Sequence, residues 1–201
     1  NAKKELLHLG RYAMRSFELA YDYIVNNTEK SADKGHKTEE AINKIDEDLT
    51  RYLIDLSSEP LSQKESEVLT NILDSSRDLE RIGDHGEALI NLTDYIRRKK
   101  VEFSPAALQE LDLIYNMTLS FIKESLKSVE DNDIELANSL VAKHEAIDKM
   151  ERRLRKTHIH RLNRGECSTQ AGVNFIDIIS HYTRVADHAM NLAEKVQAEQ
   201  I

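Results

Sequence analysis

The chain has 201 residues with a formal net charge of −8, and 32% of its residues are charged. It contains only two prolines, six glycines and no tryptophan, which argues against a many-stranded sheet, because such a sheet needs frequent turns and aromatic residues. The negative charge argues against a duplex nucleic-acid binder, the single cysteine excludes an internal disulfide, and no apolar run is long enough to span a bilayer.

Apolar residues at helical spacing predict three helices in the first half of the chain. The first runs roughly from Lys3 to Asn26. Thr28 caps the second, which ends before the turn at residues 57–60. Ser62 and Glu65 have the spacing of a capping box, which opens the third helix.

Three more helices follow in the second half. Ser104 and Pro105 provide a cap and a proline at the first helical position, so they begin the fourth helix. Residues 131–133 (Asp-Asn-Asp) form a turn and cap before the fifth. Gly165 suits a left-handed stop, and Ser168 caps the last helix.

The two halves resemble each other when the sequence is shifted by about a hundred residues. Ile45-Asp46 aligns with Ile147-Asp148, and Arg81-Ile82-Gly83-Asp84-His85 aligns with Arg184-Val185-Ala186-Asp187-His188. A period this long indicates a duplicated domain. We therefore expect an all-α fold of two tandem antiparallel three-helix bundles, with repeats at residues 1–101 and 102–201. An elongated, charged rod of this kind is typical of a binding or coupling element.

The third helix carries the most distinctive polar pattern. Glu80 and Asp84 lie one turn apart, and two like charges at this spacing need a cation nearby. The cation is either an arginine, Arg77 or Arg81, or a metal ion such as magnesium, manganese or iron, which prefer oxygen ligands. The alternative is a solvated acidic face with weak ion pairs.

The second repeat departs from this pattern, because Thr183 stands where the first repeat has Glu80. Asp187 is retained, and Asn191 follows it by one turn. Asp46 and Asp148 hold equivalent positions in the two repeats, and an ion pair to a neighbouring helix is the alternative explanation for them.

Two metal-like motifs are incomplete. His144-Glu145-Ala146-Ile147-Asp148 resembles the HExxH metalloprotease helix but lacks the second histidine. Glu5 and His8 have the Glu-x-x-His spacing of di-iron bundles, which require two such motifs. No phosphate-binding glycine loop, nucleophile elbow or paired-cysteine motif occurs, so we predict no catalytic residues and no enzyme.

At these residues the chain resembles the PhoU family, whose two three-helix bundles each carry a Glu/Asp-x-x-x-Asp signature. Within it, Glu5-Leu6-Leu7-His8-Leu9, residues 61–66 and Asp84-His85-Gly86-Glu87 are similar to the cytoplasmic domain of sodium/phosphate cotransporters. The resemblance implies iron, manganese or zinc bound by the acidic signatures. The implied metal ligands are Glu80, Asp84, Asp187, Asp46 and Asp148, and the supporting motif residues are Arg81, Arg184, His85, His188 and Asn191.

Three functional hypotheses follow. In the first, the chain is a regulatory domain at the cytoplasmic face of the membrane that tunes a sodium-dependent phosphate cotransporter through metal- or partner-dependent contacts. In the second, it is a free-standing PhoU-type adaptor between a phosphate transporter and a sensor kinase, as a monomer or a homodimer. In the third, it is a metal-dependent carboxylate enzyme. A basic run at residues 152–164 fits an acidic partner or lipid headgroups.

Overall fold

Helix caps at the expected positions set the lengths of six helices. The computed structural model describes residues 2–26 and 28–201, and places α1 at Ala2–Asn26, α2 at Glu29–Ser57, α3 at Gln63–Arg98, α4 at Pro105–Asp131, α5 at Ile134–Asn163 and α6 at Thr169–Gln197. Ser62 forms the predicted capping box with Glu65, and Ser104 and Ser168 accept hydrogen bonds from the first turns of their helices. Thr28 has the extended backbone of a cap, but its side chain makes no capping hydrogen bond.

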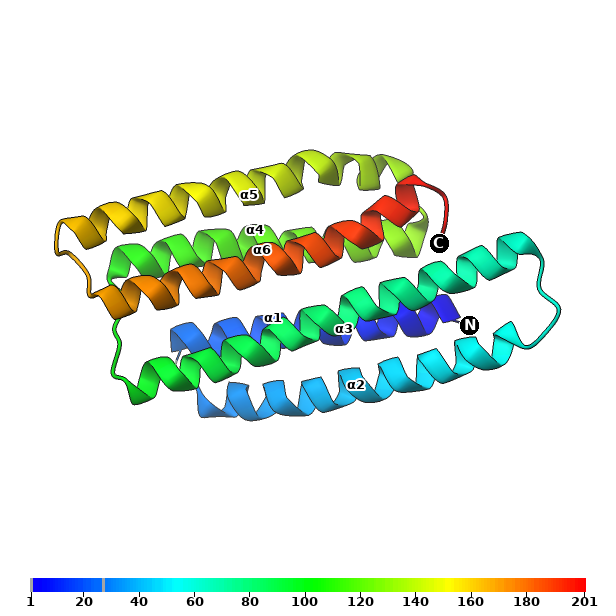
Figure 1. Cartoon of the computed structure of the whole chain (residues 1–201), viewed down its shortest axis with the longest axis horizontal. Helices are drawn as coiled ribbons and strands as arrows, with labels where there is room; N and C mark the ends of the chain where they lie inside the picture. Colours follow the sequence, from blue (N-terminus) through cyan, green and yellow to red (C-terminus); the bar gives the residue numbers. More distant parts are fainter. Residues whose placement is uncertain (1, 27) are drawn as a thin grey trace.

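The helices form two groups of three. α1, α2 and α3 pack against one another, as do α4, α5 and α6, whereas α3 with α6 and α1 with α4 join the two groups. Figure 1 shows the resulting elongated molecule, with α2 and α5 at opposite outer edges. No strand occurs among the described residues. The predicted all-α fold of two tandem three-helix bundles is therefore confirmed, while the exact repeat boundaries, 1–101 and 102–201, remain a prediction.

Aromatic side chains connect the bundles at their shared interface. The Phe17 ring of α1 lies 5.3 Å from the Tyr115 ring of α4 and 5.1 Å from the Tyr182 ring of α6, measured between centroids. Phe17 and Tyr182 are fully buried. Because burial of such rings stabilises a contact strongly, the hydrophobic core runs from one bundle into the other.

No described helix is both long enough and apolar enough to cross a membrane. The helices are amphipathic, with buried apolar stripes and charged outer faces.

Candidate functional site

Acidic side chains from α2 and α3 gather on the first bundle. Asp46 of α2 accepts a hydrogen bond from the hydroxyl of Ser76, which is fully buried on α3. Glu80 and Asp84 lie one and two turns further along α3, and the mostly exposed Arg81 guanidinium lies 3.3 Å from an Asp84 oxygen. We refer to Glu39, Asp46, Glu80 and Asp84 as the first acidic cluster.

Glu39 belongs to this cluster because Gly83 leaves room for it. The Glu39 side chain projects from α2 and is only 9% exposed, and its Oε2 atom has no hydrogen-bond partner among the described residues. A Cβ atom at position 83 would lie 2.7 Å from that oxygen. The glycine of the Glu-Arg-Ile-Gly-Asp sequence therefore allows the carboxyl group to approach α3 closely.

The carboxyl groups of the first acidic cluster repel one another. Burial, followed by the charges of Asp84, Glu87 and Glu80, raises the pKa of the Glu39 carboxyl to about 7. Burial also raises the pKa of Glu80, and the neighbouring Asp84 adds to the shift. Carboxyl groups that resist ionisation because of burial and like charge are suited to a cation that would relieve both effects.

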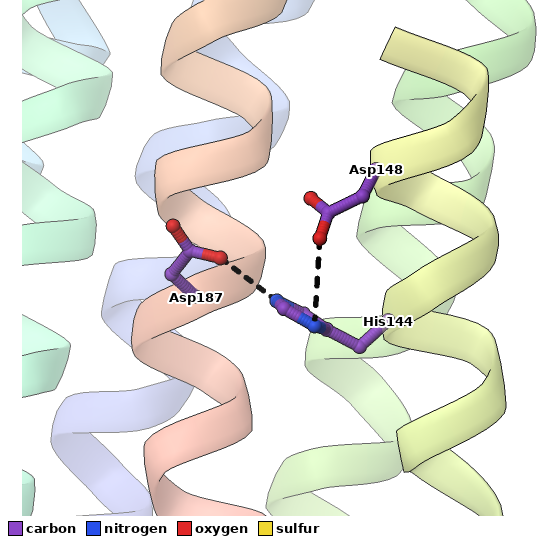
Figure 2. A group of neighbouring side chains, drawn as sticks. All are labelled: His144, Asp148 and Asp187. Atoms are coloured by element: carbon purple, nitrogen blue, oxygen red, sulfur yellow. Dashed lines mark hydrogen bonds and ion pairs between the residues drawn. The ribbon is translucent and has the colours of Figure 1, made fainter. Parts of the chain in front are cut away.

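A second cluster lies between α5 and α6 and consists of His144, Asp148 and Asp187. One donor atom from each residue lies within 4.8 Å of the others. The His144 Nε2 atom is 2.8 Å from an Asp187 oxygen, and its Nδ1 atom is 4.0 Å from an Asp148 oxygen (Figure 2). His144 is partly buried, whereas Asp148 and Asp187 are 37% and 57% exposed.

The donors of the second cluster suit a divalent transition metal. One imidazole nitrogen with two carboxylates is a ligand set that zinc, manganese and iron accept. The exposure of both aspartates leaves one side of the cluster open to solvent. The structure thus brings together the predicted ligands Asp148 and Asp187, and adds His144 to them.

The two predicted signature histidines lie elsewhere, at the contact between α3 and α6. Nδ1 of His85 is 2.9 Å from Nδ1 of His181, and Nδ1 of His188 is 2.9 Å from an Asp78 oxygen. Asn191 donates a hydrogen bond to the same Asp78 oxygen. These motif residues therefore join the two bundles.

Arg184 belongs to the same contact. It is exposed on α6, and its positive charge lowers the pKa of His85 after the larger effects of burial, His181 and His188. It thus has a different setting from Arg81, its counterpart in the first repeat, which lies beside Asp84.

A sequence model described as the PhoU domain matches residues 6–93 and 111–196, which covers both repeats. The chain belongs to the PhoU family. A PhoU homologue from Thermotoga maritima, called a phosphate-specific transport system accessory protein, is 32% identical over 133 residues, which cover 66% of this chain and 56% of that protein. The chain thus spans little more than half of this curated relative.

Two further PhoU-related proteins extend the comparison. A putative inorganic phosphate export protein of Escherichia coli K12, YjbB, is 25% identical over 164 residues, which cover 81% of this chain and 30% of that protein. The crystal structure of PhoU from Pseudomonas aeruginosa has a TM-score of 0.88 at 19% identity and covers 97% of this chain and 93% of its own. The latter similarity concerns the PhoU fold alone.

The sequence did not predict two residues of these sites: Glu39 of the first acidic cluster and His144 of the second cluster. His144 precedes Asp148 by one helical turn. Although this stretch lacks the second histidine of the protease motif, its spacing indicates that the two side chains lie on the same face of the helix. Glu39 gave no such signal, because its place beside Gly83 depends on how α2 packs on α3.

Proposed function

We propose that this chain is an accessory regulator of phosphate transport that acts on the cytoplasmic side of the membrane through metal-dependent contacts. The observation that carries the proposal is the match of the PhoU domain to both repeats. The Thermotoga relative, named as a phosphate transport accessory protein, supports the same biological setting.

The two clusters supply the metal-dependent part of the proposal. His144, Asp148 and Asp187 would hold a cation between α5 and α6. The carboxyl groups of the first acidic cluster, whose like charges contribute to the raised pKa of Glu39, would attract a cation between α2 and α3. Iron, manganese and zinc fit the nitrogen and oxygen donors. A bound cation would neutralise the carboxylates, so metal loading would change the charge of both outer faces of the molecule.

A free-standing adaptor is the form that the relatives favour, because the Thermotoga protein is named as an accessory protein of a phosphate-specific transport system. Its partners would be a phosphate transporter and a sensor kinase. The YjbB match favours a second form, in which the same fold is a regulatory part of a longer phosphate-transport protein, such as a sodium/phosphate cotransporter.

Regulation fits the geometry of the second cluster better than catalysis does. An enzyme that uses a metal commonly encloses the reacting groups and excludes water. Asp148 and Asp187 instead face solvent. A solvent-exposed cluster of this kind suits a surface whose charge a binding partner recognises. We therefore propose a regulator and not an enzyme.

Phosphate uptake by a bacterial strain that lacks its own PhoU-type protein tests the proposal. We expect expression of this chain to change the rate of uptake, and the Glu80→Ala/Asp84→Ala variant to lose that effect. The matched control is Asp33→Ala/Asp55→Ala, which removes two exposed acids outside the clusters. Uptake that is unaffected by the unaltered chain would contradict a role in phosphate transport.

A further inference from the structure

The outer face of the second half of α5 carries a concentrated positive charge. Residues 149–164 include seven lysines and arginines but one acid, Glu151, although the chain as a whole has a net charge of −8. Lys149, Arg152, Arg153 and Lys156 are exposed, and so is His160. Their spacing of three and four residues places them on one side of the helix. We call these five residues the basic stripe.

The cations of the stripe are unpaired, in contrast to the neighbouring arginines. Arg155 forms an ion pair with Glu151, and Arg161 pairs with Glu110 at 2.6 Å. No carboxylate among the described residues lies within ion-pair distance of Lys149, Arg152, Arg153 or Lys156. Acidic side chains thus neutralise these two arginines beside the stripe, while the cations on the outer face remain available for a partner.

The internal repeat provides a comparison within the same molecule. The equivalent stretch of the first repeat, residues 47–62, comprises the end of α2 and the turn after it, and contains one basic residue, Arg51, and four acids. Both helices occupy the outer edge of their bundle (Figure 1), so the requirements of packing are similar. The positive charge is therefore specific to the second repeat and is not a consequence of the fold.

We propose that the basic stripe of α5 is a docking surface for an anionic lipid bilayer. Among the described helices, α5 contacts only α4 and α6, so none of them covers its opposite side. From Lys149 to His160 the stripe is about 16 Å long. A planar array of anionic headgroups can contact such a surface without a complementary groove, and clusters of four or more lysines and arginines attract it.

An exposed apolar side chain distinguishes the stripe from a purely electrostatic surface. Ile159 is 44% exposed and lies three residues after Lys156, next to His160. An apolar residue between cations can enter the boundary between headgroups and acyl chains, which adds to lipid affinity but offers nothing to a flexible acidic peptide. This docking goes beyond the proposed function and depends on neither metal cluster.

Sedimentation with lipid vesicles tests the proposal in the absence of any transporter. The protein, kept metal-free with a chelator, is mixed at about 0.1 M salt with vesicles of phosphatidylcholine alone or with added phosphatidylglycerol. We expect binding only to the anionic vesicles, and loss of binding at high salt. Arg152→Glu/Arg153→Glu/Lys156→Glu should reduce the bound fraction by about tenfold or more.

The matched control is Lys4→Glu/Arg11→Glu/Lys123→Glu, which changes the net charge equally at exposed cations on α1 and α4. It should retain most of the binding. Should the α5 variant melt early, Arg152→Gln/Arg153→Gln/Lys156→Gln replaces it and should show the same direction of change.

Three results would overturn the proposal: no binding of the unaltered chain to anionic vesicles, equal binding by the α5 variant, or equal loss in the control. Binding to polyglutamate without binding to vesicles would overturn it in favour of an acidic protein partner. Because the vesicles contain no phosphate transporter, a negative result does not contradict the proposed regulatory function, which the phosphate-uptake experiment tests separately.

Discussion

Nδ1 of His85 lies 2.9 Å from Nδ1 of His181 across the contact between α3 and α6. At this distance one nitrogen donates a proton and the other accepts it, so at least one imidazole must be neutral. The repeat-equivalent pair is Asp78 with His188, in which a carboxylate faces the imidazole and Lys195 lies 3.7 Å from the same carboxylate. The contact between the bundles is thus duplicated, but a carboxylate faces the histidine in one copy and a second imidazole faces it in the other.

Acidification should therefore weaken the protein at the His85–His181 pair. Burial, with the positive charges of His181, His188, Arg184 and Arg81, lowers the pKa of His85 from 6.5 to about 4. The unfolded chain takes up a proton that the folded protein does not, so stability falls as the pH drops from 6.5 towards 4. We expect this pair to account for a loss of about 1–2 kcal/mol.

Urea denaturation at several pH values measures this loss. His85→Gln should make the free energy of unfolding less dependent on pH between 6.5 and 4, and His8→Gln, at a partly exposed histidine of α1, should not. An identical pH dependence in the parent and in His85→Gln would contradict the assignment.

Glu39→Gln should stabilise the metal-free protein at alkaline pH. Folding raises the pKa of the Glu39 carboxyl from 4.5 to about 7, so the folded protein holds a proton that the unfolded chain releases. Its stability therefore falls as the pH rises from 4.5 through 7, and a neutral amide removes that penalty. We expect a gain of about 1–3 kcal/mol at pH 8, measured by urea denaturation with a chelator present. A variant less stable than the parent at pH 8 would show that the ionised Glu39 carboxylate does not destabilise the folded protein.

Gly83→Ala should destabilise the first bundle. The new Cβ atom would lie 2.7 Å from Glu39 Oε2 and 2.8 Å from a methyl carbon of Ile42. Overpacking costs about 1–3 kcal/mol, towards the lower end here because both atoms are ends of flexible side chains, and the helix preference of alanine over glycine offsets about 1 kcal/mol of it, so we expect a small net loss. In a thermal or urea double-mutant cycle, Glu39→Ala should recover part of the loss, because it removes one of the two clashes. A Gly83→Ala variant that is more stable than the parent by the full helical gain of about 1 kcal/mol would rule out the close approach of α2 and α3 at this point.

The sequence predicted the fold well because the fold depends on local signals. The capping box at Ser62, the left-handed residue at Gly165 and the six apolar stripes act within a few residues of one another. The duplication then required that both halves adopt the same arrangement. These signals were sufficient for the bundles, but they carried no information on how the two bundles pack together.

The candidate sites were only partly predictable for the same reason. Asp148 and Asp187 were expected from their alignment with the first repeat, but His144 enters the cluster only because α5 lies against α6. His85 and His188 looked like part of the acidic signature. They instead meet partners on the opposite bundle because α3 and α6 run antiparallel, so that Asp78 faces His188 and His85 faces His181.

His144→Ala should weaken metal binding at the second cluster while leaving the first intact. The imidazole is the only nitrogen donor among the three residues, and without it two exposed aspartates remain. Calorimetric titration with zinc or manganese should show at least about a tenfold loss of affinity at one class of site. His8→Ala serves as the control, and equal affinities for His144→Ala and the parent would exclude His144 as a ligand.

The most direct test of a metal-dependent regulator is the metal content of the purified chain, measured by elemental analysis after expression with iron, manganese and zinc supplied. We compare the parent with Glu80→Ala/Asp84→Ala, with Asp148→Ala/Asp187→Ala and with the control Asp33→Ala/Asp55→Ala. We expect near-stoichiometric metal in the parent and the control, and loss of part of it in each cluster variant. A parent that is metal-free under these conditions would contradict the account, and the acidic clusters would then be surfaces for protein contact.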